Sequence, residues 1–213
     1  MIIAYAHIKN HQVAVNGSVV FSRKASVPLP EFLAEVYKAL GISYPKFHKM
    51  DTLCKLGTLC TEFALKEGDF LKDNPLSQIA IVILNAASSL ETDRQHQVTI
   101  TNKSAYFPSP GIFVYTLPNI IIGELAIKYK ITGENAFFIS PEFDGALIVN
   151  YIETLFNEHT QAAIGGWVEV DGNSYEAFIF LTEIQRNTNK SSNFKPLNQV
   201  TVTELYNKTI WTN

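Results

Sequence analysis

The sequence predicts an α/β fold in which a mostly parallel, mixed sheet is flanked by helices. The first observation is a set of short, continuous apolar runs, such as residues 78–85, which are rich in β-branched residues as buried central strands are. The second is that segments with apolar residues at helical spacing separate these runs. Strands that alternate with helices favour a parallel sheet with helices packed on it.

The N-terminal segment predicts short strands. Residues 3–8, 12–15 and 19–21 are the expected strands, and Asn16 and Gly17 between the last two are typical of a tight hairpin turn. The fold is therefore expected to open with a small β element.

The rest of the chain is expected to alternate between helices and strands. The first helix, residues 31–40, follows Pro28 and Pro30 and ends at Gly41. The other helices are expected at residues 51–66, 119–130 and 143–157, and the other strands at residues 78–85, 136–139, 162–168 and 175–182. The last strand is expected to form an antiparallel hairpin with its predecessor. The polar residues 186–193 are interpreted as a linker to a short C-terminal tail, within a single domain spanning residues 1–213.

Composition and charge exclude several classes of function. The chain has 213 residues, of which 46% are hydrophobic, which is enough for a sizeable core. A net charge of −3 and a pI near 6.0 disfavour nucleic-acid binding. No stretch approaches the roughly 20 apolar residues of a membrane span, and the N-terminal run lacks the features of a secretory signal. We therefore expect a cytoplasmic protein that binds neither nucleic acid nor membranes.

The two cysteines, Cys54 and Cys60, are expected to be buried free thiols. Their spacing places them on different sides of the predicted helix, which disfavours a disulfide. They cannot form a four-ligand zinc site alone, and no nearby histidine has ligand spacing. Neither a metal ion nor another cofactor is expected.

The stretch from residue 119 to residue 169 resembles the core of β-ketoacyl synthases, whose fold is thiolase-like. Residues 133–135 (GEN) are similar to the family's Gly-Pro-Asn motif, with glutamate in place of proline. Residues 164–167 (IGGW) followed by Glu169 are similar to its Ala-Gly-Gly-x-Glu motif. The resemblance covers residues 45–182, and it implies the N-terminal half of a thiolase-like fold.

Counting without gaps between the flanking glycines places Glu142 where the family has its nucleophilic cysteine. The resemblance implies a sharp strand-to-helix turn there, where backbone N–H groups and the helix dipole stabilise an anion. Acyl transfer to a carboxylate would give a hydrolysis-prone mixed anhydride instead of the thioester that condensation requires. We call this turn an elbow, and the residues expected to shape it are Gly133, Asn135, Gly145, Gly165 and Gly166.

The family's catalytic histidines and oxyanion loop lie in a C-terminal half that this sequence does not contain. None of its histidines stands in a similar context: His7, His11, His48, His96 and His159. The resemblance therefore implies that the chain alone is not a competent 3-oxoacyl-carrier-protein synthase.

The resemblance implies a non-catalytic, chain-length-factor-like subunit in fatty-acid, polyene or polyketide biosynthesis. Its expected partners are a full-length ketosynthase and an acyl carrier protein, and a homodimer is an alternative assembly. One alternative is an acyl-transfer, hydrolytic or condensing enzyme that acts on carrier-protein thioesters when paired, with Glu142 as the reacting carboxylate and Asp144 in a secondary role. A further alternative is an acyl- or carrier-protein-binding module.

Several polar residues have plainer structural explanations. Glu142 and Asp144 also fit the acidic first turn of a helix, and Ser140 fits a cap more readily than a hydrolase nucleophile, since the flanking glycines of that motif are absent. His159 fits a solvated turn. Four further candidates follow a buried strand at the end where α/β folds often bind ligands, although loop and cap chemistry explains them equally well: Ser88, Ser89, Thr92 and Asp93.

Residues 108–118 combine prolines and aromatic residues in an unusual way. Packing is the default role of aromatic side chains. In the resembling family the equivalent region lies near the acyl channel and the dimer interface. An interface, if this chain has one, is expected there.

Overall fold

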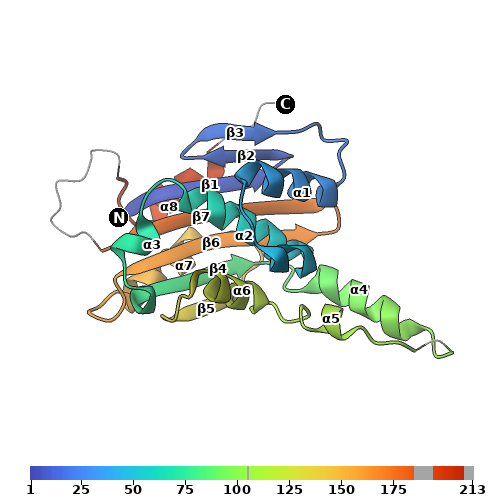
Figure 1. Cartoon of the computed structure of the whole chain (residues 1–213). Helices are drawn as coiled ribbons and strands as arrows, with labels where there is room; N and C mark the ends of the chain where they lie inside the picture. The colour runs from blue at the N-terminus through green and yellow to red at the C-terminus, as the bar shows by residue number, and fades with distance from the viewer. Residues whose placement is uncertain (105, 185–193, 209–213) are drawn as a thin grey trace.

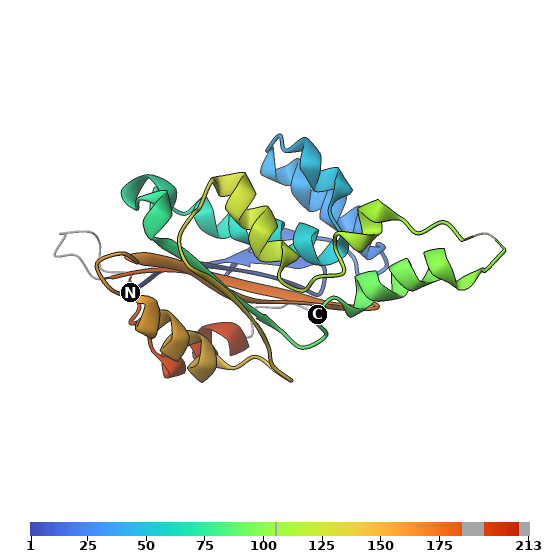
Figure 2. The ribbon, with the colours of Figure 1, turned by 90° about the horizontal axis from the view of Figure 1, so that it is seen from below.

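The computed structural model describes residues 1–104, 106–184 and 194–208. A seven-stranded sheet with the order β3-β2-β1-β7-β6-β4-β5 forms the centre of the molecule. Helices cover both faces of this sheet, with α1, α2 and α6 on one face and α7 and α8 on the other (Figures 1 and 2).

The strands follow the predicted runs closely. Their bounds are β1 (Ile2–Lys9), β2 (Gln12–Val15), β3 (Ser18–Ser22), β4 (Ile79–Asn85), β5 (Asn135–Ile139), β6 (Ala162–Asp171) and β7 (Ser174–Glu183). Strand β4 runs parallel to β5 and β6, whereas every other neighbouring pair is antiparallel. The expected mixed sheet flanked by helices is confirmed, but the expectation that it is mostly parallel is wrong. Tight turns join β1 to β2, β2 to β3 and β6 to β7, and such turns permit only antiparallel pairing.

The predicted helices are also present. The bounds are α1 (Leu29–Leu40), α2 (Thr52–Leu65), α3 (Phe70–Asp73), α4 (Leu90–Thr101), α5 (Pro110–Phe113), α6 (Ile120–Tyr129), α7 (Gly145–Leu155) and α8 (Gln199–Asn207), with 3₁₀ turns at Pro45–Lys49 and Leu76–Gln78. Within the described residues, no helix combines the length and the apolar character needed to cross a bilayer.

Helix α2 is the most deeply buried helix, and it packs against β7, β1 and β6. Asp51 caps its first turn by accepting a hydrogen bond from the Cys54 backbone N–H at 2.8 Å. Cys54 and Cys60 are free and fully buried, as expected. Burial raises the pKa of both thiols, so they have little of the thiolate character that cysteine chemistry requires.

The C-terminal segment covers the opposite face of the sheet. The residues expected to form a short tail contain α8, which packs on α7 and buries Val202 and Leu205 in a second apolar core. The predicted linker at residues 186–193 lies outside the described residues. Helix α8 thus joins the face of the sheet on which α7 lies.

Residues 90–104 and 106–118, which we call the arm, project from the body of the molecule (Figures 1 and 2). Helix α4 was not among the predicted elements, because this helix is polar and only Thr92 is buried on it. Large apolar side chains of the arm are exposed to solvent: Val98, Tyr106, Phe107, Phe113, Val114 and Leu117.

Candidate functional site

The carboxyl ends of the parallel strands β4, β5 and β6 meet at one edge of the sheet. The turn after β5 and the loop after β4 lie side by side there, because the Ser140 backbone N–H donates to the Asn85 carbonyl at 2.9 Å. We call residues 140–145 the elbow and residues 85–89 the β4 loop. This edge is where open α/β sheets bind ligands most often.

The elbow exposes Glu142 and uses its neighbours for local structure. The buried Ser140 hydroxyl donates to the Glu142 carbonyl oxygen at 2.8 Å. Asp144 caps α7 by accepting from the Leu147 backbone N–H at 2.8 Å. Ser140 and Asp144 therefore have the structural roles considered for them, whereas the Glu142 side chain is accessible to water or to a partner.

The glycines singled out in the sequence do not gather at the elbow. Only Gly145 lies in it, where a Cβ atom would overlap Thr203 of α8. Gly165 and Gly166 lie within β6, where a Cβ atom would overlap the Phe180 ring and the Phe178 carbonyl oxygen, respectively.

Gly133 and Asn135 lie at the other end of β5. A Cβ atom on Gly133 would overlap the Ile79 carbonyl oxygen, and Asn135 is the exposed first residue of the strand. The positions predicted for the elbow thus serve close approaches of the backbone at separate places in the sheet.

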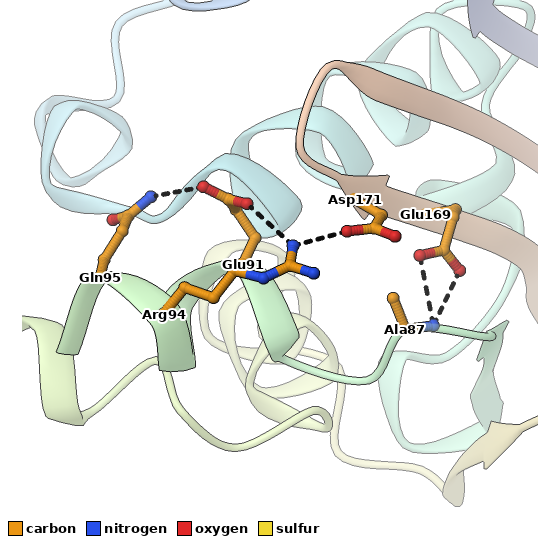
Figure 3. Close-up of polar contacts among 6 residues, drawn as sticks. All are labelled: Ala87, Glu91, Arg94, Gln95, Glu169 and Asp171. Carbon is orange, nitrogen blue, oxygen red and sulfur yellow. Dashed lines mark hydrogen bonds and ion pairs between the residues drawn. The ribbon is translucent and has the colours of Figure 1, made fainter. Parts of the chain in front are cut away.

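The β4 loop binds the side chain of Glu169, which follows the Gly-Gly pair of β6. Its carboxylate accepts a hydrogen bond from the Ala86 backbone N–H at 2.6 Å. It also accepts from the Ala87 backbone N–H at 3.2 Å, as Figure 3 shows. Asn85 closes the loop through two hydrogen bonds with the Ser88 backbone. Successive backbone N–H groups of this kind form an anion-binding concavity, and here the chain's own carboxylate occupies it.

The remaining candidates near the β4 loop attach the arm to the body. The Ser89 hydroxyl donates to the Thr116 carbonyl at 2.9 Å, and the Thr92 hydroxyl donates to Asp51 at 2.8 Å. Burial raises the pKa of Asp51, although hydrogen bonds from Cys54 and Thr92 oppose this effect.

Ion pairs strengthen the same attachment. Arg94 on α4 bridges Glu91 and Asp171 at the end of β6, as Figure 3 shows. Asp93, the last candidate, lies 3.1 Å from the same Ser89 hydroxyl, whose single proton it shares with the Thr116 carbonyl. These polar residues therefore position the arm, which agrees with the structural explanation by loop and cap chemistry.

An aromatic cluster lies behind the elbow. The Phe143 ring stacks on Tyr206 of α8 with 4.1 Å between centroids, and the His7 ring lies 4.5 Å from Phe178. The Tyr206 hydroxyl donates to Glu176 at 2.9 Å. Burial and, to a smaller extent, the nearby Lys9 ammonium together lower the pKa of His7 to about 3. This cluster joins four distant segments of the chain, and no local sequence signal pointed to it.

His159 lies in the connection between α7 and β6. His159 is exposed beside Glu158 at 3.4 Å, in keeping with a solvated turn. Among the residues that the structure describes, no three His, Cys, Asp or Glu side chains are arranged to hold a metal ion.

No protein-family model matches this chain, and no curated protein matches it significantly. Solved structures do. The ishigamide ketosynthase/chain length factor matches with a TM-score of 0.59 and 15% identity, over 89% of this chain and 63% of that chain. The complex of the ketosynthase ApeO with its chain length factor ApeC from Xenorhabdus doucetiae matches with a TM-score of 0.57 and 14% identity, over 88% of this chain and 79% of that chain.

The chain has a thiolase-like fold. A third structure, AntDE:AntF, in which a type II polyketide synthase acyl-carrier protein is bound to its ketosynthase, matches with a TM-score of 0.57 and 13% identity. This match covers 85% of the present chain and 61% of the matched chain. It therefore spans about three fifths of the longer chains that it matches. At these identities the likeness concerns the fold, and the role of Glu142 remains a prediction.

Proposed function

We propose that this chain is a non-catalytic, chain-length-factor-like partner of a full-length ketosynthase in fatty-acid, polyene or polyketide biosynthesis. The observation that supports this most directly is an exposed apolar arm on a thiolase-like chain whose elbow presents a carboxylate. The matched structures are described as ketosynthases with a chain length factor or a carrier protein, which is consistent with such a partnership.

Two surfaces are suited to the partner. The arm exposes Phe107 by 78% and Phe113 by 61%, and exposed apolar groups of this size mark interaction sites. Strand β5 is an edge strand of the sheet, and among the described residues it pairs only with β4. Ile139 at its end is 54% exposed. An open edge strand is a template for pairing with another chain. Figure 1 shows the arm leaving the molecule on the side where β5 forms the edge of the sheet.

The elbow explains why the proposed role is not catalytic. A carboxylate at residue 142 cannot hold an acyl chain as a thioester. Its negative charge would also repel the carboxylate of a malonyl group, which argues against decarboxylation. We infer that the chain supplies a wall of the partner's acyl tunnel and stabilises the partner.

Association with a ketosynthase tests this proposal. We expect the chain to co-purify with a full-length ketosynthase from the same organism. Phe107→Asp should reduce the recovered complex at least tenfold, because a charge would be buried at the interface. Val200→Asp is the matched control, since Val200 is 65% exposed on α8, far along the chain from the arm. A wild-type chain that neither binds a ketosynthase nor alters its product length would refute the proposal, and so would self-association in place of that complex.

Glu142→Gln separates the scaffold from the alternative in which Glu142 reacts once the chain is paired. The exposed position of Glu142 just before α7 is the observation that keeps this alternative open. For a scaffold we expect turnover of the complex within about twofold of wild type, whereas removal of a general base typically costs about 100-fold or more. Glu153→Gln, at an exposed carboxylate of α7, is the control. A large loss of turnover confined to Glu142→Gln would favour the enzyme.

A further inference from the structure

A cleft of about 970 Å³ lies at the end of the sheet where β1 ends, and it includes no residue of the elbow. Its walls are the β1–β2 turn, the residues that follow β3, and the β6–β7 turn with the start of β7. We propose that this cleft binds a phosphate-bearing small molecule. The inference does not depend on the proposed partnership with a ketosynthase.

The charge of the cleft is opposite to that of the chain as a whole. Three cationic side chains, Lys9, Arg23 and Lys24, line it together with a single carboxylate, Glu176, although the chain has a net charge of −3. Cations gathered in a concave surface raise the local concentration of anions. The charge therefore favours an anionic ligand.

The single carboxylate serves to position Lys9. One oxygen of Glu176 accepts from the Lys9 ammonium at 2.8 Å, and the other accepts from the Tyr206 hydroxyl at 2.9 Å. Both of its oxygens are thus engaged on protein groups. Lys9 retains two further N–H donors, because an ammonium group has three.

The other two cations are available to a ligand. Arg23 is paired with Glu35, but both side chains are more than two fifths exposed, and exposed pairs contribute about 0–1 kcal/mol. A doubly charged phosphate can therefore draw the guanidinium away from Glu35, and its geometry suits bidentate binding. Lys24 is exposed on the same wall.

The floor of the cleft is held in place before any ligand binds. Asn10 and His11 both have left-handed backbone angles, with φ of 51° and 57°, as a two-residue hairpin turn requires. The His11 N–H donates to the Tyr175 hydroxyl at 2.8 Å, its carbonyl accepts from the Arg23 N–H at 2.8 Å, and its ring nitrogen Nε2 lies 2.7 Å from the Val27 carbonyl. A preorganised wall lowers the entropic cost of binding.

The volume of the cleft and its neutral groups indicate what accompanies the phosphate. Small-molecule sites measure about 300–1,000 Å³, so a lone phosphate would leave most of this cleft unfilled. Ser22, Ser174 and Asn173 add hydroxyl and amide groups to the lining. We therefore expect a phosphate joined to a polar organic body, of which a nucleoside diphosphate is a suitable probe.

Calorimetric titration of the full chain at low salt tests the inference. We expect inorganic pyrophosphate to bind saturably with a Kd of about 1 mM or below, ADP to bind at least as tightly, and adenosine not to bind. ADP that binds more tightly than pyrophosphate supports an organic phosphate as the ligand, whereas equal affinities support free phosphate groups as the ligand. Absence of saturable binding by both pyrophosphate and ADP would overturn the inference, as would adenosine binding as tightly as ADP.

Variants assign the binding to this cleft. Lys24→Gln should weaken the binding of pyrophosphate at least fivefold. The double variant Lys24→Gln, Arg23→Gln should weaken it at least tenfold, because each substitution removes one cation from the wall. Lys103→Gln, at an exposed lysine of the arm, should leave the affinity unchanged. Thermal melts of each variant monitor folding, and Lys24→Gln breaks no hydrogen bond or ion pair that the structure assigns to Lys24. Wild-type affinity in the double variant would refute the assignment.

Discussion

Replacing Gly166 with alanine should lower the midpoint of thermal unfolding by about 10 °C, which corresponds to a loss of about 3 kcal/mol for a chain of this length. The new Cβ atom would overlap the carbonyl oxygen of Phe178 and the side chain of Ile179, both in the neighbouring strand β7. A carbonyl oxygen in the middle of a sheet cannot rotate away as a flexible side chain can. The two longest strands must therefore separate locally, with loss of their ladder hydrogen bonds.

Gly68→Ala is the matched control for this experiment. Nothing lies within 4 Å of a Cβ atom at Gly68, and its φ angle is not positive. We expect its midpoint to be unchanged or slightly raised, since alanine restricts the unfolded chain more than glycine does. If Gly166→Ala and Gly68→Ala have the same midpoint of thermal unfolding, the close approach of β6 and β7 is not the reason for glycine at residue 166.

Acid should destabilise the protein through His7. The His7 pKa is about 3 in the folded chain and about 6.5 when unfolded, so the unfolded chain takes up the proton first. The stability associated with neutral His7 is fully present above about pH 6.5 and is lost as the pH falls from there towards 3. We expect a loss of about 2 kcal/mol in the free energy of unfolding between pH 7.5 and pH 5.

Urea unfolding of His7→Leu at the same two pH values isolates this contribution. The difference between the two pH values should shrink by about 2 kcal/mol in the variant, whatever the substitution costs at neutral pH. The raised pKa of Asp51 has the opposite effect on the pH dependence of stability, but this effect is present in both the wild type and the variant. His159→Gln, at an exposed histidine, is the matched control. An undiminished pH dependence in His7→Leu would show that His7 is not the responsible group.

Local patterns predicted most of the elements. The apolar run of β4 is buried at every residue, and the Asn16-Gly17 turn has the positive φ angles that such a hairpin requires. Asp51 and Gly41 delimit helices where capping chemistry expects them. Helix α4 was missed because it is held by Thr92 and Arg94 at its base instead of by an apolar stripe.

The sequence by itself determined all the strands and most of the longer helices, and it placed Glu142 in the turn that follows β5. Only the tertiary structure decided that Glu169 fills the β4 loop, that Phe143 stacks on Tyr206, and that Lys9 and Lys24 share a cleft. The physical reason is that periodicity and capping act within a few residues. These contacts instead join side chains far apart in the chain, as in the 83 positions between Ala86 and Glu169. The likeness to β-ketoacyl synthases predicted the thiolase-like fold, whereas the hydrogen bonds of the polar groups at the edge of the sheet could be found only after the strands were paired.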